Sequence, residues 1–290
     1  MFNGALTALI TPFRDGAVDE PALRDLVEWQ IQSGIDGLVP CGSTGESATL
    51  THEEHERVVM ITIEQARKRV PVIAGTGSNA TAEAIRLTAS ARAMGADGAL
   101  LISPYYNKPT QEGIFRHYKL IAASVDLPLV VYNIPGRTAS NIAPETFARL
   151  SEIKNIVGVK EASGSMDQVS DILRLCGDRL AILSGDDALT LPIMALGGKG
   201  VISTASNVMP REMHELAAAA LAGDFQRGRV VHYRLLPLLR MLFIETNPIP
   251  LKCALALMGK CANELRLPLV PMTAAASEKL KATMKELQLL

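Results

Sequence analysis

Residues 129–161 read LVVYNIPGRTASNIAPETFARLSEIKNIVGVKE and contain two short apolar runs, at 129–132 and 156–159. Neither run alternates apolar and polar side chains, which is typical of strands buried on both faces of a parallel sheet. Between the runs, Pro144 stands where the first turn of a helix tolerates a proline. The segment therefore predicts a strand, a helix and a second strand parallel to the first.

The same unit recurs along most of the chain. Its apolar runs lie at 5–10, 37–39, 70–74, 99–103, 129–132, 156–159, 181–184 and 201–203. Longer stretches with helical periodicity follow the runs, and two of them begin with clear caps, at Asp19 and at the capping box of Thr51 and Glu54. Eight such units favour an α/β fold of the (β/α)8 TIM barrel class.

The C-terminal part has a different pattern, because only helical periodicity remains after Pro210. The expected helices cover residues 211–222, 225–242, 249–258 and 273–289. We therefore expect a catalytic barrel at 1–224 and a C-terminal helical extension at 225–290. In barrels of this class the catalytic residues lie at the carboxyl ends of the strands.

Composition excludes several classes of function. The chain has 290 residues, 48% of them hydrophobic, with 29 basic against 30 acidic side chains and no basic cluster, so we expect no nucleic-acid partner. No apolar stretch reaches the length of about 18 residues that a membrane helix needs, and the N-terminus does not resemble a signal peptide. The four cysteines form no CxxC pair, which favours reduced thiols and a cytoplasmic location.

Lys160 directly follows the apolar run at 156–159. Burial disfavours the ammonium form of a lysine, and its pKa can then fall to roughly 7 to 8. A neutral amine can attack a carbonyl carbon at physiological pH. Lys160 is therefore the candidate nucleophile, and the alternative is a structural lysine that pairs with Glu161 or with a helix end.

Tyr132 and Arg137 lie at and just after the end of the neighbouring run, 129–132. The phenol of Tyr132 can carry a proton to and from a carbinolamine. The planar guanidinium of Arg137 can bind a carboxylate through two hydrogen bonds. A buried tyrosine is more often a packed side chain, so Tyr132 becomes a specific candidate only together with Lys160.

Three other motifs carry weaker signals. The turn at 41–47 has small residues and hydroxyls that suit a carboxylate or a proton relay. Residues 75–80 match the dinucleotide pattern GxGxxG/A, but the acidic Asp97 precedes the next strand instead of following it. His52 and His55 have a spacing that could hold a metal, but no third ligand is evident and we expect no metal.

Together, the candidate residues resemble the dihydrodipicolinate synthase family, within the superfamily of pyruvate-dependent class I aldolases and N-acetylneuraminate lyases. The motifs that carry this resemblance are 42–46, 105–107, 132–138, 158–161, 183–187 and 247–250. The resemblance extends from Met1 through the C-terminal helices. Arg137 is the residue that chiefly indicates this family among its relatives.

The resemblance implies a lyase in which Lys160 forms a Schiff base with pyruvate. The derived enamine attacks L-aspartate 4-semialdehyde and gives 4-hydroxy-tetrahydrodipicolinate, in lysine and diaminopimelate biosynthesis. The implied proton relay consists of Tyr132, Ser43 and Tyr106, with Tyr106 supplied by a neighbouring subunit. No cofactor is expected, because the lysine imine itself activates pyruvate.

The resemblance also implies the substrate contacts. Thr44 is expected to bind the carboxylate of pyruvate and Arg137 that of the aldehyde, while Gly185 and Ile202 line the pocket through their backbone. Ser43 departs from the commonest family pattern, which has threonine at this position. Serine keeps the hydroxyl but loses the methyl group that restricts its rotamer, so we expect an intact mechanism with a looser relay.

Regulation and assembly are implied in the same way. We expect feedback inhibition by L-lysine at a subunit interface of a homotetramer, a dimer of dimers. The expected lysine-binding residues are Ser47, Ala48, His52, His55, Asn79, Glu83 and Tyr105. In this interpretation His52 and His55 form, near Glu83, a polar pocket for the charged groups of an amino acid.

Two alternatives stay open. Another aldolase of the superfamily, acting on N-acetylneuraminate or on 2-keto-3-deoxy sugar acids, fits the same lysine, and Ser43 does not separate these activities. Arg137 argues against it, because a sugar needs hydroxyl partners at that place. A non-catalytic barrel that senses lysine would not require Lys160.

Overall fold

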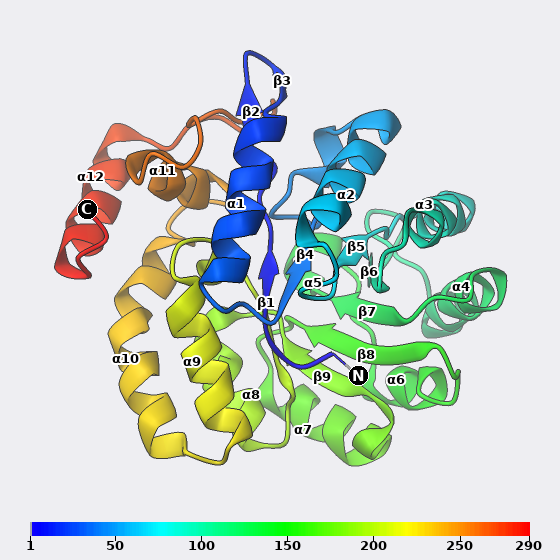
Figure 1. Cartoon of the computed structure of the whole chain (residues 1–290). Helices are drawn as coiled ribbons and strands as arrows, with labels where there is room; N and C mark the ends of the chain where they lie inside the picture. Colours follow the sequence, from blue (N-terminus) through cyan, green and yellow to red (C-terminus); the bar gives the residue numbers. More distant parts are fainter. Residues whose placement is uncertain (1) are drawn as a thin grey trace.

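Eight parallel strands form one sheet in the computed structural model, which describes residues 2–290 (Figure 1). The strands are β1 (Gly4–Ala8), β4 (Gly37–Val39), β5 (Ile73–Gly75), β6 (Gly98–Ile102), β7 (Leu129–Asn133), β8 (Ile156–Glu161), β9 (Ala181–Ser184) and β10 (Gly200–Ser203). They pair in the order β4–β1–β10–β9–β8–β7–β6–β5. A parallel bridge between Leu38 and Val72 joins the two ends of this order, so the sheet closes into a barrel.

The strand and helix order confirms the predicted (β/α)8 class. Helices follow the strands and surround them on the outside (Figure 1). They are α1 (Glu20–Gln32), α2 (His52–Ala66), α3 (Thr81–Met94), α4 (Gln111–Ser124), α6 (Pro144–Leu150), α7 (Met166–Cys176), α8 (Thr190–Ala195) and α9 (Pro210–Leu221). Shorter helical turns are η1 (Ser47–Thr49), α5 (Pro135–Thr138), η2 (Gly177–Arg179), η3 (Asp187–Leu189) and η4 (Ala205–Asn207).

The helix starts form as their caps predict. The Asp19 side chain accepts a hydrogen bond from the Ala22 amide, and Thr51 and Glu54 form the reciprocal capping box of α2. Pro144 occupies the first turn of α6. Each cap satisfies amide groups that have no partner inside the helix.

A two-stranded hairpin, β2 (Phe13–Arg14) and β3 (Ala17–Val18), was not predicted. Its strands are too short for any periodicity to show. Asp15 and Gly16 make the turn with positive φ angles of 53° and 81°. The hairpin follows β1, and its Phe13 ring is fully buried.

Two kinds of core hold the barrel together. Inside it, apolar side chains from seven of the eight strands meet in one cluster, Leu6, Ala8, Val39, Ile73, Leu100, Val130, Tyr132, Leu183 and Ile202. Outside it, larger clusters fill the layer between the strands and the helices. This burial on both faces explains why the strands read as continuous apolar runs.

The C-terminal segment forms α10 (Phe225–Met241), α11 (Ile249–Leu257) and α12 (Ala274–Glu286), close to the predicted bounds. Helix α10 packs on α9, and α12 packs on α10 and α11. Leu235 of α10 and Leu280 of α12 belong to the same core cluster as Met213 of α9. The division of the chain at 224/225 stays a prediction; Asp224 is the N-cap of α10.

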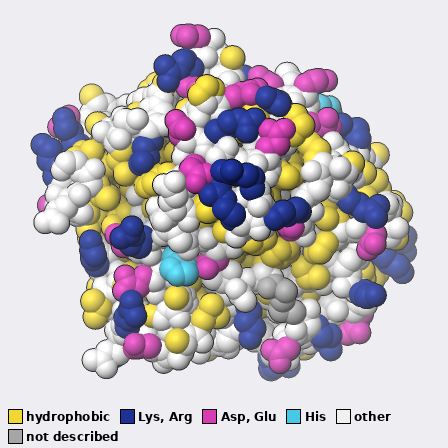
Figure 2. Space-filling view, viewed as in Figure 1, with side chains coloured by type: hydrophobic (Ala, Val, Ile, Leu, Met, Phe, Trp, Pro, Cys, Tyr) yellow, Lys and Arg dark blue, Asp and Glu magenta, His cyan; other side chains and the backbone are white. Residues whose placement is uncertain are grey.

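The surface in Figure 2 carries basic and acidic side chains side by side, with apolar side chains between them. Among residues 2–290, no helix is both long and apolar enough to cross a membrane. The expected cytoplasmic location stays a prediction.

Candidate active site

Lys160 lies inside the barrel near the carboxyl end of β8, in register with Tyr132 on β7 and Leu183 on β9. Its side chain is buried, and its Nζ lies 4.2 Å from the centroid of the Tyr132 ring. Burial lowers the pKa of Lys160 to about 8; the negative charge of Asp187 opposes this shift, and the positive charge of Arg137 adds to it. A usable share of the amine is therefore neutral near pH 7.

Tyr132 keeps its proton at neutral pH. Burial raises the pKa of its phenol to about 12, while the charge of Arg137 and a hydrogen bond with Ser43 partly offset this effect. The structure therefore brings Lys160, Tyr132, Ser43 and Arg137 into one site. A protonated phenol beside an amine nucleophile can donate a proton and take it back.

Asn247 joins the two predicted carboxylate contacts. Its Nδ2 donates to the Oγ1 of Thr44 at 3.0 Å, and its backbone carbonyl accepts from Nη2 of Arg137 at 2.8 Å. Asn247 lies just before α11, far from both partners in sequence. Sequence reasoning quoted it within a motif but gave it no role, because no local pattern reveals a contact across so many residues.

Asp187 is a second residue for which sequence reasoning gave no role. It begins the turn η3 after β9 and is buried, and its Oδ2 accepts from the amides of Thr204 and Ala205, both at 3.0 Å. Its Oδ1 has no hydrogen-bond partner among the described residues. Burial raises the pKa of this carboxyl group, and its negative charge raises the pKa of Lys160.

Gly185 and Ile202 lie where the prediction expects the pocket. A Cβ added at Gly185 would stand 3.2 Å from Cε of Lys160 and 2.7 Å from Cβ of Ala162, so a side chain there would crowd the lysine. Ile202 belongs to the inner barrel cluster together with Tyr132. Their roles in binding substrate stay predictions.

Tyr106 lies apart from the other proposed relay residues. It follows β6, its backbone has a positive φ of 72°, and 89% of the residue is exposed, against 5% for Tyr132. Within residues 2–290 the Tyr106 hydroxyl has no hydrogen-bond partner. The buried Tyr118 hydroxyl, by contrast, donates to the backbone oxygen of Leu101. A single chain therefore leaves the predicted third relay group on its surface.

The residues predicted to bind lysine fall into two groups. His52 Nε2 lies 2.9 Å from Oε1 of Glu83 on the surface, and Asn79 Nδ2 donates to the backbone oxygen of Tyr105 at 3.1 Å. Ser47 and Ala48 are in η1 nearby in sequence. The ring of His55 is instead buried, 2.7 Å from the Gly75 oxygen through Nε2, and burial lowers its pKa. The two imidazoles thus have different partners, and the described residues contain no group of three potential metal ligands.

The glycines of the dinucleotide-like pattern have a packing role. A Cβ at Gly75 would stand 2.2 Å from the Cys41 oxygen, and one at Gly77 would stand 2.3 Å from the Ile102 amide. Only glycine allows these close approaches between neighbouring backbones. The pattern therefore has a structural explanation.

Three comparisons place the chain among known proteins. A model of the Dihydrodipicolinate synthetase family matches residues 1–287. A 4-hydroxy-tetrahydrodipicolinate synthase of Syntrophus aciditrophicus is 60% identical over 285 residues, 98% of each chain. The pyruvate complex of the dihydrodipicolinate synthase from Acinetobacter baumannii has a TM-score of 0.99 at 44% identity and covers 100% of both chains.

A third relative has a different ligand. The structure of the enzyme from Cyanidioschyzon merolae with lysine bound has a TM-score of 0.97 at 41% identity, and the match covers 100% of this chain and 99% of that one. Fold and sequence therefore agree with these relatives over nearly the full length of the chain. The chain belongs to the dihydrodipicolinate synthase family.

Proposed function

We propose that this protein is a lyase that condenses pyruvate with L-aspartate 4-semialdehyde to give 4-hydroxy-tetrahydrodipicolinate. The observation that carries the proposal is the buried amine of Lys160, whose pKa is lowered to about 8, in register with the protonated phenol of Tyr132. A neutral amine in a dry site is the group that class I aldol chemistry requires. The names of relatives that cover nearly the whole chain support the choice of reaction.

In the proposed mechanism, the Lys160 amine attacks the ketone carbon of pyruvate and forms a carbinolamine. Loss of water gives a protonated imine, which draws electrons from the adjacent methyl group, so that loss of a C3 proton yields an enamine. Tyr132 donates the proton that leaves with the water. Its oxygen accepts a proton when the transfer runs in the opposite direction, and Ser43 passes these protons on. Tyr106 of a partner subunit would complete this relay.

The enamine carbon then attacks the aldehyde carbon of the second substrate, and the aldehyde oxygen takes up a proton. The amino group of the bound product displaces Lys160 from the imine carbon, which closes the ring and restores the lysine. Thr44 would hold the pyruvate carboxylate and Arg137 the carboxylate of the aldehyde. Both contacts are supported by Asn247, which hydrogen-bonds to each of these side chains.

The choice of aldehyde is tested by incubating the protein and pyruvate with L-aspartate 4-semialdehyde, with N-acetylmannosamine or with glyceraldehyde. We expect product only with the first aldehyde, because the guanidinium of Arg137 matches a carboxylate. Arg137→Ala should raise the KM of this aldehyde without preventing imine formation with pyruvate. Faster turnover with either sugar would assign the chain to another activity of the superfamily.

We also propose that L-lysine inhibits the enzyme at the cluster around His52 and Glu83. The hydrogen bond between these side chains and the contact of Asn79 with the Tyr105 backbone form a polar surface. Tyr105 directly precedes Tyr106 of the proposed relay. The relative from Cyanidioschyzon merolae was solved with lysine bound. Titration with L-lysine should lower turnover, and Glu83→Gln should weaken inhibition while basal turnover is kept; unchanged turnover at saturating lysine would contradict the proposal.

The proposed assembly is a homotetramer built as a dimer of dimers. One argument is Tyr106, which is exposed in the single chain although the relay needs it. A second is the set of exposed apolar side chains on and near α8 and α10, Leu196, Val230 and Tyr233. Sedimentation equilibrium should give four chains per particle, and a stable, fully active monomer would contradict the proposal.

A further inference from the structure

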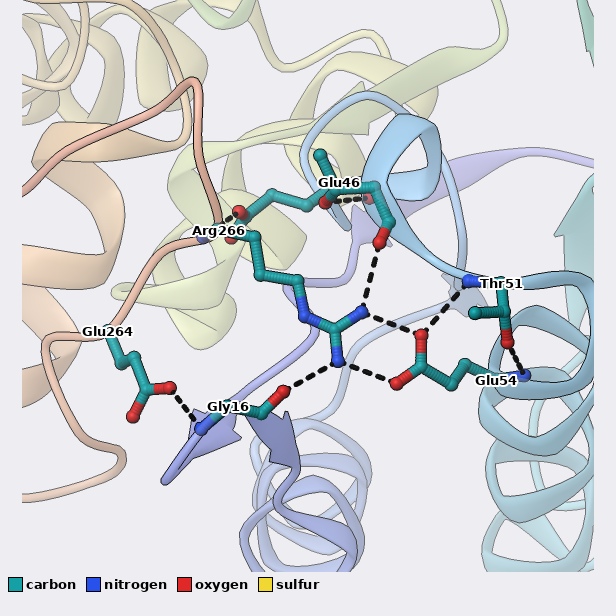
Figure 3. Close-up of polar contacts among 7 residues, drawn as sticks. Gly16, Glu46, Thr51, Glu54, Glu264 and Arg266 are labelled. Carbon is teal, nitrogen blue, oxygen red and sulfur yellow. Dashed lines mark hydrogen bonds and ion pairs between the residues drawn. The ribbon is translucent and has the colours of Figure 1, made fainter.

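A buried ion pair connects the C-terminal helices to the turn that carries Ser43 and Thr44. Glu46 follows this turn directly, and its Oε1 lies 2.5 Å from Nζ of Lys252 on α11; the two side chains are 1% and 0% exposed. The other carboxylate oxygen of Glu46 accepts from the backbone amide of Arg266 at 3.2 Å (Figure 3). Both oxygens of Glu46 are therefore bound by residues of the C-terminal segment.

The ammonium group of Lys252 has two further partners that fix its place. It donates to the backbone oxygen of Glu264 at 2.8 Å and lies 4.0 Å from the centroid of the Phe13 ring. The guanidinium of Arg266 lies 4.4 Å from the same centroid. A desolvated cation is attracted by an aromatic face, so Phe13 of the hairpin helps to hold both cations.

Arg266 fixes the far end of the same loop. Its guanidinium binds both carboxylate oxygens of Glu54 at 2.6 Å, and Glu54 caps α2 through Thr51 (Figure 3). The guanidinium of Arg266 also donates to the backbone oxygens of Thr49 and Gly16, at 2.9 and 2.8 Å. The chain between the active-site turn and α2 is thus tied to the C-terminal segment at its beginning and at its end.

The backbone at the turn needs such a support. Glu46 has a φ of 52°, in the left-handed region that residues other than glycine rarely adopt. The turn before it has only small side chains, and Thr44 has a single side-chain partner, Asn247. A buried ion pair is weak evidence for stability, because an apolar pair of similar volume stabilises a fold equally well. The hydrogen bonds that flank the pair, from the Arg266 amide to Glu46 and from Lys252 to the Glu264 oxygen, can instead fix the positions of both side chains.

We propose that Lys252 and Glu46 are positioning residues for pyruvate: the pair holds the turn so that Ser43 and Thr44 face the substrate bound to Lys160. Neither residue touches the reacting atoms. The inference rests on the proposed function, which assigns Thr44 to the pyruvate carboxylate. It predicts that loss of the pair weakens pyruvate binding more than it weakens binding of the second substrate.

The test compares Lys252→Met, Glu46→Gln and the double variant with wild type. The readouts are the melting temperature and the pyruvate concentration that gives half-maximal borohydride trapping on Lys160. Each single variant leaves one buried group without its charged partner and should melt lower, whereas the double variant removes both charges and should recover most of the melting temperature. All three should need roughly ten- to hundredfold more pyruvate, because a displacement of about 1 Å has effects of this size.

Lys260→Met is the matched control. Lys260 is also a lysine of the C-terminal segment that lies over an aromatic ring, 3.7 Å from the centroid of Trp29. Among the described residues its ammonium group has no hydrogen bond or ion pair with the turn at 41–47. The half-saturating pyruvate concentration of Lys260→Met should stay within about twofold of the wild-type value, because this substitution leaves the site geometry unchanged.

A double variant that folds and traps pyruvate at the wild-type concentration would overturn the inference, since the pair would then serve stability alone. If the double variant does not fold, Glu46→Asp carries the test, because it keeps both charges and withdraws the carboxylate by one methylene group. Unchanged half-saturation in Glu46→Asp would overturn the inference as well. Failure of wild type to trap pyruvate would instead refute the proposed function, before any variant is compared.

Discussion

Lys160 differs from the surface lysines of this chain because its side chain is buried, and keeping an ammonium ion away from water costs free energy. Burial lowers its pKa to about 8, and two neighbouring charges act on it in opposite directions, Asp187 upward and Arg137 downward. The reactivity of the site is thus the balance of three electrostatic effects. Tyr132 responds to burial in the opposite sense and stays protonated.

The rate of imine formation with pyruvate should therefore depend on pH. Below about pH 8 the amine is mostly protonated, and the rate should rise about tenfold per pH unit until it levels off above this value. Stopped-flow mixing with pyruvate between pH 6 and 9.5 measures this profile. A rate that still rises tenfold per pH unit up to pH 9.5 would mean that the amine titrates like an exposed lysine.

Asp187→Asn should shift this profile to lower pH. The carboxylate raises the pKa of Lys160, so a neutral amide at the same place removes an effect that favours the ammonium ion. The amide oxygen can still accept from the amides of Thr204 and Ala205, so the turn should keep its shape. A shift to higher pH would show that the influence of Asp187 has the opposite sign.

At the scale of elements, the site depends on a segment that lies outside the eight strand and helix units. The residues before α11 reach the turn after β4 and the helix α5 after β7 at the same time, through Asn247. The strands place Lys160 and Tyr132, while the C-terminal segment places the groups proposed to bind carboxylates. If Thr44 and Arg137 bind the substrate carboxylates as proposed, the extension is part of the active site.

Asn247→Ala separates the two contacts of this residue. It removes the hydrogen bond to Thr44 and keeps the backbone carbonyl that binds Arg137. Loss of one such hydrogen bond costs about 1 kcal/mol, so the KM of pyruvate should rise roughly three- to tenfold and that of the aldehyde should change less. Steady-state kinetics with each substrate varied in turn measures both KM values. A rise in the KM of the aldehyde alone would contradict this account.

The elements also show what the sequence can predict. All eight strands and the helix caps depend on local patterns, continuous apolar runs and cap residues, and these were confirmed. Lys160 was found because it directly follows such a run. Local patterns did not reveal Asn247, Asp187 or the pair of Lys252 and Glu46. Their partners become neighbours only in the folded chain and lie up to about two hundred residues away in sequence.

At the scale of the whole molecule, one chain contains most of the site but leaves Tyr106 on its surface, 89% exposed. The proposed relay is complete only when a second chain supplies this residue. The exposed aromatic and its positive φ angle are then features of an interface. Assembly and catalysis become linked, because a separated chain lacks a relay group.

Co-expression of two inactive variants tests this link. Lys160→Ala and Tyr106→Phe should each be nearly inactive alone. A mixed dimer contains one site with both defects and one intact site, so random mixing should restore about a quarter of the wild-type activity per chain. No recovery in verified mixed dimers would place Tyr106 in the site of its own chain.

The most direct measurement of the central claim is reduction of the protein with borohydride in the presence of pyruvate, followed by peptide mass spectrometry. Our account predicts one reduced pyruvate adduct per chain, on the peptide that contains Lys160, and none in Lys160→Ala. Condensation that continues at near-normal speed in Lys160→Ala, or an adduct on a different lysine, would contradict it.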